Sequence, residues 1–93
     1  MARLTLSSRA QRDLKRLDRP DRDRVVNVLR EALSADRPPD NLDIRPLTGR
    51  APWLRLRVGP LRVLYRPAPD VPDTFIIERI VHRRDLERAV RQL

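Results

Sequence analysis

The sequence contains no cysteine, a single histidine, and only one lysine among its 21 basic residues. Without cysteine the chain can form neither a disulfide nor a thiolate metal site, and one histidine without clustered carboxylates argues against a metal centre. We therefore expect no metal and no other cofactor. The sequence also lacks an apolar run of transmembrane length and the apolar N-terminal stretch of a signal peptide. These absences predict a cytoplasmic protein that does not enter a membrane.

Arginine supplies almost all of the positive charge. The 93 residues indicate one domain, spanning residues 1–93, with a modest core. The net charge is +8, and the excess lies mainly in residues 44–93, which hold 11 basic and 5 acidic residues, against 10 and 8 in residues 1–43. A charge of this size predicts a polyanionic partner, such as nucleic acid, a ribosome or a strongly acidic protein.

Residues 44–69 concentrate this charge, because they include six arginines and no Asp or Glu. The six are Arg45, Arg50, Arg55, Arg57, Arg62 and Arg66. Within this stretch, Trp53–Val58 and Leu61–Arg66 alternate apolar and other residues on either side of Gly59-Pro60. The alternation predicts a β-hairpin with a two-residue turn, in which the glycine takes a positive φ.

Counting outward from the turn gives the expected register of this hairpin. Three apolar pairs fall on the side that would face a core: Leu54–Tyr65, Leu56–Val63 and Val58–Leu61. On the other side Arg57 lies opposite Arg62, and Arg55 lies opposite Leu64. Like charges directly opposite each other weaken a sheet by up to roughly 1 kcal/mol. This unfavourable pair favours an anion-binding surface, and the alternative is a solvated face of an arginine-rich protein.

The rest of the pattern predicts an α+β domain of order β-α-α-β-β-β-α. An N-terminal strand and a helical hairpin would pack on a small, mainly antiparallel sheet, with the helices on one face. We expect a strand over residues 2–6, helices from Ser7 or Ser8 to Leu17 and from Asp18 or Asp21 to Ser34, a loop over residues 35–52, a buried strand over residues 74–81, and a last helix capped by Asp85. Trp53 is expected under a loop, and Tyr65 and Phe75 in the core.

Two motifs carry a resemblance to a known group of proteins. Arg55-Leu-Arg-Val-Gly-Pro-Leu-Arg-Val-Leu-Tyr65, followed by Ile80-Val-His-Arg-Arg-Asp85, resembles the RelE/ParE superfamily of type II toxins, and the element order agrees along nearly the whole chain. The resemblance implies a RelE-like toxin of a toxin–antitoxin system. In the RelE branch, which we favour, the activity is ribosome-dependent mRNA cleavage, and in the ParE branch it is inhibition of DNA gyrase. A cognate antitoxin in a hetero-oligomer is the implied protein partner.

The same resemblance implies which residues act. Arg55 and Arg57 match the paired bases of the hairpin, Arg62 matches the arginine before Val-Leu-Tyr, and Arg83 matches the arginine after the last strand. The chain departs from the pattern at Glu87, where many RelE-like toxins carry a tyrosine. Further phosphate contacts are predicted at Arg45, Arg50, Arg66 and Arg84.

The chemistry of RNA cleavage adds a role for the single histidine. Arginine pairs phosphate oxygens through its planar fork, but it stays protonated and cannot serve as a general base. His82 is the only side chain that titrates near neutrality. We predict His82 as base or acid with Arg62 and Arg83 on the phosphate, unless the ribosome or the RNA supplies the proton-transfer groups. Alternatively, His82 ends a buried strand and is hydrogen-bonded to backbone.

A binding module without catalysis is the third hypothesis for this chain. Modules that bind RNA on a sheet commonly stack bases on exposed aromatic pairs. This sequence has one Trp, one Tyr and one Phe, and two of these three are expected in the core. The aromatic content therefore places a plain RNA-binding module last among the three hypotheses.

Overall fold

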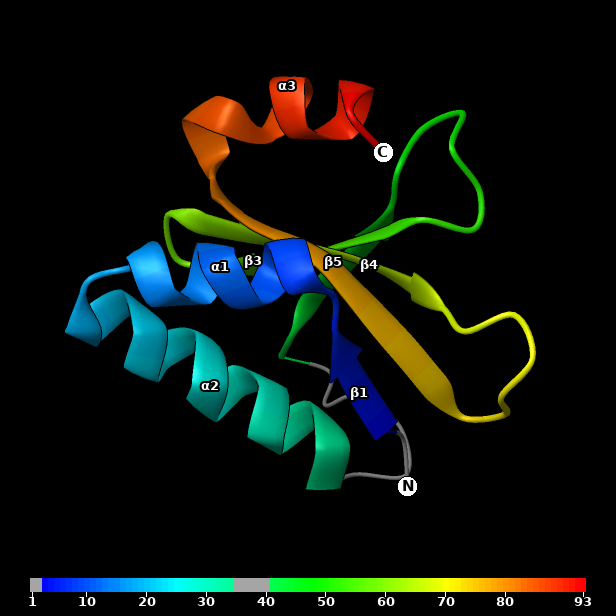
Figure 1. Ribbon diagram of the computed structural model, residues 1–93, viewed down its shortest axis with the longest axis horizontal. Coiled ribbons are helices and arrows are strands. Elements are labelled where there is room, and N and C mark those ends of the chain that lie inside the picture. The colour runs from blue at the N-terminus through cyan, green and yellow to red at the C-terminus, as the bar shows by residue number, and fades with distance from the viewer. Residues whose placement is uncertain (1–2, 35–40) are drawn as a thin grey trace.

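A five-stranded sheet with helices on both faces forms the domain, seen in a computed structural model that describes residues 3–34 and 41–93 (Figure 1). The strand order is β1-β5-β4-β3-β2. The elements are β1 (Arg3–Leu6), α1 (Ser8–Arg16), α2 (Arg19–Ser34), β2 (Asp43–Pro46), β3 (Leu54–Val58), β4 (Leu61–Pro67), β5 (Thr74–His82), a 3₁₀ turn (Arg83–Asp85) and α3 (Leu86–Arg91). Strand β1 is parallel to β5 and the other neighbours are antiparallel, so the predicted α+β class and mainly antiparallel sheet are confirmed.

The helical hairpin begins where the sequence predicts. Ser7 Oγ accepts a hydrogen bond of 3.1 Å from the backbone N–H of Ala10, and Asp18 Oδ1 accepts one of 3.0 Å from that of Asp21. Each cap satisfies a backbone donor that the first turn of a helix leaves without an intrahelical partner. The two caps therefore fix the starts of α1 and α2, and both helices lie across the same face of the sheet (Figure 1).

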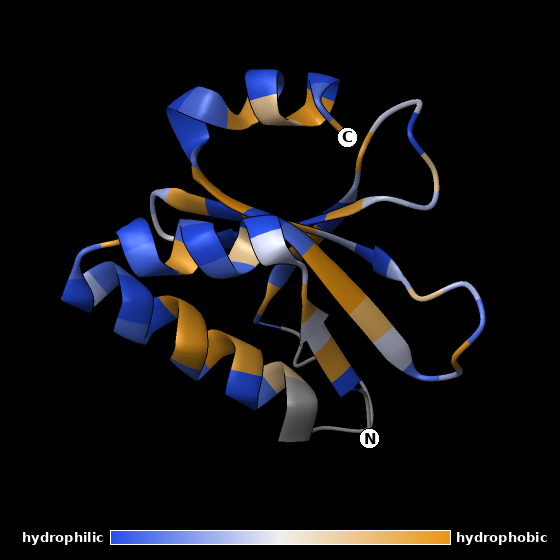
Figure 2. Ribbon diagram, in the orientation of Figure 1, coloured by the Kyte–Doolittle hydropathy of each residue, from blue (hydrophilic) through white to orange (hydrophobic). Residues whose placement is uncertain are grey.

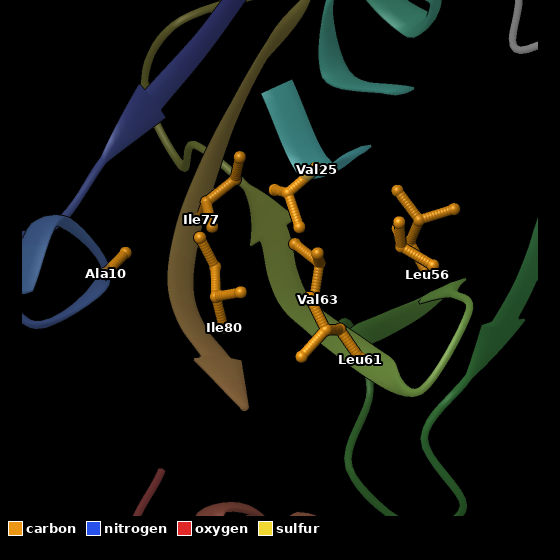
Figure 3. Close-up of a cluster of buried hydrophobic side chains, with 8 residues drawn as sticks. Ala10, Val25, Leu56, Leu61, Val63, Ile77 and Ile80 are labelled. Atoms are coloured by element: carbon orange, nitrogen blue, oxygen red, sulfur yellow. The ribbon is translucent and has the colours of Figure 1, made fainter. Parts of the chain in front are cut away.

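The main core lies between these two helices and the sheet. Val25 of α2 and Leu61, Val63 and Ile77 of the sheet are fully buried there, and Figure 3 shows their side chains gathered between the ribbons. The alternating apolar residues of β3 and β4 supply the sheet side, as the hairpin pattern predicts. Burying a side chain of this size stabilises a fold by roughly 1.5–3 kcal/mol.

The last helix corrects the prediction that all helices share one face. Helix α3 lies on the opposite side of the sheet from α2 (Figure 1), and its apolar side is turned toward the strands (Figure 2). Ala89 of α3 forms a second core cluster with Leu64 and Val81, two apolar residues on the side of the sheet that carries the arginines. Burial of Leu64 and Val81 requires another apolar surface on this side of the sheet, which explains why α3 packs on that face.

Two further expectations are wrong. Residues 43–46, predicted as part of a loop, form strand β2 and pair with β3, so the sheet gains an edge strand that its short Asp-Ile-Arg-Pro sequence does not signal. Residues 35–40 of the same predicted loop lie outside the described residues. Asp85 takes the predicted N-cap position of α3, but its side chain makes no capping hydrogen bond; its Oδ1 instead accepts one of 2.9 Å from Arg88 Nη2.

Beyond the end of β1, the backbone of Ser7 and the side chain of Asp13 make the hydrogen bonds along this edge of β5. Strand β1 ends at Leu6, so it pairs with β5 only as far as Ile77. Beyond that point the Ser7 N–H donates to the carbonyl of Ile77 at 2.9 Å, and Asp13 Oδ2 accepts from the N–H of Ile80 at 2.9 Å. The same carboxylate accepts from Arg79 Nε at 2.8 Å. Helix α1 is therefore attached to β5 by charge-assisted hydrogen bonds as well as by apolar packing.

The rings of Tyr65 and Phe75 meet edge to face at the margin of the main core. Their centroids are 5.7 Å apart, a favourable geometry for an aromatic pair. Tyr65 packs against the core as predicted, whereas Phe75 is only half-buried and is not part of it. Burial raises the pKa of the Tyr65 phenol to about 12, because the charged phenolate loses hydration there.

Stability should consequently fall at high pH. The neutral phenol is favoured in the folded state, so the unfolded chain, with a tyrosine pKa of about 10, loses its proton first. Stability from this group is complete below pH about 10 and is lost as pH rises to about 12. Because Tyr65 is the only tyrosine, the ultraviolet absorbance of phenolate reports on it alone. Tyr65→Phe should remove this pH-dependent step, and a folded-state titration near the urea-unfolded value would contradict the expectation.

Candidate phosphate-binding site

The hairpin of β3 and β4 has the register that counting from the turn predicts. Arg57 lies opposite Arg62, Arg55 lies opposite Leu64, and Gly59 has a φ of 55°. Side chains of directly opposite residues share a face, so Arg55, Arg57 and Arg62 project to the side away from α1 and α2. The alternation of the sequence therefore places three arginines next to one another on one surface.

Arg83 joins these three, and together they form what we call the arginine cluster: Arg55, Arg57, Arg62 and Arg83. The backbone N–H of Arg83 donates to the carbonyl of Pro60 at 2.9 Å, which holds the end of β5 against the hairpin turn. The pKa of Arg62 is lowered from its usual value, first by desolvation and then by the positive charges of Arg57, Arg55 and Arg83. Arg55, Arg57 and Arg83 are thus close enough to Arg62 for their charges to act on its guanidinium.

The hairpin turn holds the guanidinium of Arg62 in place. Its Nη1 donates to the carbonyl oxygens of Gly59 at 2.9 Å and Leu61 at 2.8 Å. Among the described residues no ion pair includes Arg62, so its charge is oriented by backbone oxygens rather than neutralised by a carboxylate. A fixed, uncompensated guanidinium is suited to pairing the oxygens of a phosphate.

The other cluster members differ in how free they are. Arg57 and Arg83 are exposed, and neither takes part in an ion pair within residues 3–34 and 41–93. The Arg55 side chain is only 16% exposed, and its Nη2 lies 3.5 Å from Oδ1 of Asp43. Of the four cluster members, only Arg55 therefore has a paired carboxylate among the described residues.

The arginines predicted as additional phosphate contacts lie around the cluster. Arg45 of β2 is 74% exposed and its Nε is 3.4 Å from Asp43 Oδ1. Arg66 lies 3.7 Å from Glu78, and its guanidinium carbon is 5.6 Å from the ring centre of Trp53, a cation–π geometry. Arg50 is half-buried in the segment between β2 and β3, and Arg84 is exposed.

Counter-ions for the arginine-rich segment come from outside it. Asp43 precedes residues 44–69 by one position, and Glu78 reaches Arg66 from the neighbouring strand β5. Sequence counting missed both, because strand pairing joins residues that are far apart in the chain. In the sequence, only the position of Asp43 next to the segment indicates that a counter-ion is near.

His82 lies apart from the arginine cluster. It pairs with Leu61 across β4 and β5, whereas Val81 pairs with Arg62. The imidazole therefore belongs to the face of the sheet that α1 and α2 cover, and Arg62 belongs to the opposite face. His82 Nδ1 is buried and makes no hydrogen bond to any part of the chain that the structure describes. The structure therefore brings Arg83 to the hairpin but separates His82 from the predicted phosphate contacts.

The arginine cluster lacks groups that could bind a metal ion. Across the described ranges no three His, Cys, Asp or Glu side chains come together in a way that could hold one.

Arg57 and Asp43 also line an open groove of about 460 Å³ between α2 and β3, with Val28 and Val58 among its apolar walls. The guanidinium groups of this surface are suited to binding anions.

Solved structures of RelE toxins share this fold. A chain of the RelB–RelE antitoxin–toxin complex from Methanococcus jannaschii is 24% identical, with a TM-score of 0.75 over 90% of this chain and 95% of that one. A chain of the RelBE2 complex from Mycobacterium tuberculosis is 27% identical, with a TM-score of 0.60 over 88% and 98%. The isolated E. coli RelE toxin is 16% identical, with a TM-score of 0.67 over the full length of both chains. The architecture is thus that of the RelE/ParE superfamily of type II toxins.

The family assignment within this class comes from the sequence. A family model described as the ParE toxin of the type II toxin-antitoxin system parDE matches residues 4–87, so the chain belongs to this toxin family. No curated protein matches the chain in sequence. In the part of the chain that the structure describes, no helix has the length and apolar character needed to span a membrane.

Proposed function

We propose that this toxin promotes cleavage of mRNA on the ribosome and that the arginine cluster binds the scissile phosphate. The observation that carries the proposal is the convergence of Arg57, Arg62 and Arg83 without carboxylate partners among the described residues. Holding like charges together costs stability, and a polyanionic ligand offsets that cost. Shared fold with RelE toxins supports the same function.

The proposed reaction is attack of the RNA 2′-oxygen on the adjacent phosphorus. The bond from phosphorus to the 5′-oxygen breaks, leaving a 2′,3′-cyclic phosphate and a 5′-hydroxyl. Arg62 and Arg83 stabilise the charge that develops on the phosphate oxygens, and Arg55 and Arg57 position the chain. The proton from the 2′-hydroxyl goes to a group of the ribosome or the RNA, and another such group protonates the 5′-oxygen as it leaves. We leave His82 out of this step because its imidazole belongs to the other face of the sheet.

We propose further that the toxin is neutralised by a cognate antitoxin in a hetero-oligomer. Similar chains from M. jannaschii, Pyrococcus horikoshii and M. tuberculosis were each solved in complex with an antitoxin. A net charge of +8 favours an acidic partner segment, which would compete with RNA for the same surface.

Inhibition of DNA gyrase is the second candidate function. The match to the ParE toxin family favours it, since that family is named for the parDE system. Glu87 at the place of the tyrosine in many RelE-like toxins, together with the separation of His82 from the arginine cluster, also favours a role without catalysis.

One pair of assays decides between the two candidates. Toeprinting of a defined mRNA on programmed ribosomes should reveal a toxin-dependent cut in the decoding site, while DNA supercoiling by gyrase should proceed unchanged in the presence of the toxin. Intact mRNA together with blocked supercoiling, from protein shown to be folded, would replace the first candidate by the second.

Phosphate binding itself has a quantitative signature. Affinity for single-stranded RNA should fall with salt, and Arg57→Ala should reduce the slope of log affinity against log salt by about 0.7, one phosphate contact on a single strand. The control is Arg30→Ala, which removes the same charge from an exposed position on α2, on the other face of the sheet. Fluorescence anisotropy at several salt concentrations measures both. Equal slopes for the two variants would mean that the arginine cluster is only solvated.

A further inference from the structure

Within residues 3–34 and 41–93, Asp43 is the one carboxylate that forms an ion pair with a member of the arginine cluster. Its Oδ1 lies 3.5 Å from Arg55 Nη2 and 3.4 Å from Arg45 Nε, so one oxygen is shared between two guanidinium groups. Strand pairing places Asp43 directly opposite Arg57. Its negative charge also raises the pKa of Arg62, against the effect of the surrounding arginines. One carboxylate therefore acts on arginines of three neighbouring strands.

Asp43 contacts the guanidinium groups of Arg45 and Arg55, the type of donor that also binds phosphate. A carboxylate and a phosphate both present paired oxygens to the fork of an arginine, so they compete for the same donors. Arg55 is 16% exposed and cannot easily turn to a second anion, whereas the Asp43 side chain is 36% exposed and has room to move aside. Edge strand β2 is only four residues long, which leaves Asp43 at the end of the sheet.

We propose that Asp43 is a built-in competitor for phosphate, which weakens the binding of single phosphate groups and restricts the arginine cluster to ligands with several adjacent phosphates. A lone phosphate that displaces Asp43 exchanges one anion for another at Arg55 and gains little. A chain of phosphates also reaches Arg57 and Arg62, neither of which forms an ion pair among the described residues. The inference rests on the proposed function in taking the arginine cluster as a phosphate site.

Removing the charge of Asp43 should therefore strengthen anion binding. Asp43→Asn keeps the shape of the side chain and should bind inorganic tripolyphosphate roughly three- to tenfold more tightly than the wild-type protein. The gain for orthophosphate should be larger still, so that the preference for tripolyphosphate over orthophosphate becomes smaller. Isothermal titration calorimetry gives both affinities, and the NMR signals of the Arg55 guanidinium, whose Nη2 contacts Asp43, report the exchange of partner.

The matched control is Asp23→Asn, which changes the net charge equally on the exposed side of α2, where Asp23 pairs with Arg19. Its affinity for tripolyphosphate should stay near that of the wild type. If Asp43→Asn bound no more tightly than Asp23→Asn, or lost binding, Asp43 would support Arg55 rather than compete, and the inference would be overturned. Absence of tripolyphosphate binding by all three proteins would overturn it too. Tighter binding by Asp43→Asn with mRNA left intact on ribosomes would instead refute the proposed function alone.

Discussion

Cleavage of mRNA on programmed ribosomes is expected to fall at least about 100-fold when Arg62 and Arg83 are both replaced by alanine. Removing one preoriented donor from a developing oxyanion commonly costs a factor of about 10²–10³. The guanidinium of Arg62 is held by two backbone carbonyls, and the backbone N–H of Arg83 donates to the carbonyl of Pro60, so Arg62 is oriented and Arg83 is placed beside the hairpin before substrate arrives. Toeprinting with wild-type and variant toxin at equal concentration measures the difference.

Two controls separate chemistry from charge and from folding. Replacing the exposed Arg12 and Arg30 by alanine removes the same net charge from the helices and should leave cleavage close to wild type. Arg62→Lys keeps a charge without the planar fork and should fall between the wild type and Arg62→Ala. Thermal unfolding checks that each variant is folded. Cleavage by the folded double variant at the wild-type rate would remove both arginines from the mechanism.

The free energy of unfolding is expected to drop by about 3 kcal/mol in Asp13→Ala. The Asp13 and Arg79 side chains are only 11% and 17% exposed, so solvent screens their ion pair little. Loss of the carboxylate leaves the guanidinium of Arg79 and the N–H of Ile80 without this acceptor. Leaving one partner of a buried charge pair unpaired costs roughly 3–5 kcal/mol, and residual exposure puts this case at the lower end. Urea unfolding followed by circular dichroism gives the value.

The stability of Asp13→Ala has a simple comparison within the same chain. Asp23 forms an ion pair with Arg19 on the surface, where the two side chains are 65% and 89% exposed. Asp23→Ala should therefore cost less than about 1 kcal/mol. Asp13→Asn retains an acceptor for the N–H of Ile80 and should be intermediate. Similar losses for Asp13→Ala and Asp23→Ala would show that the attachment of α1 to β5 depends on apolar packing instead.

Local patterns predicted those parts of the fold that local interactions determine. The register of β3 and β4 follows from alternation around Gly59-Pro60, and the helix starts follow from Ser7 and Asp18, because each depends on residues a few positions apart. Strand β2 was not predicted because its own sequence lacks a strand pattern, and its hydrogen bonds depend on pairing with β3. The side of the sheet taken by α3 depends on Leu64, an apolar residue among the arginines, whose burial is decided by tertiary packing.

The candidate site also has features that local sequence patterns predict and others that depend on strand pairing. Alternation alone placed Arg55, Arg57 and Arg62 on one face, since side chains along a strand point alternately to the two faces of a sheet. The pairing of Asp43 with Arg55 needed strand β2, and the separation of His82 from the cluster needed the register of β5 against β4. Nothing in the short motif around His82 encodes that register, which passes through a bulge near Tyr65.

The pairing of β1 with β5 has a consequence for how the protein is made. Residues 3–6 of β1 form a parallel pair with residues 74–77 of β5, so β1 can join the sheet only after β5 has been synthesised. Pairings between such distant residues form late and slowly. During synthesis a ribosome therefore carries an incomplete sheet, and Arg83 joins the hairpin only after both strands have left the exit tunnel. The arginine cluster is therefore incomplete until β5 and Arg83 have been synthesised, which leaves an interval in which a partner protein can meet the toxin first.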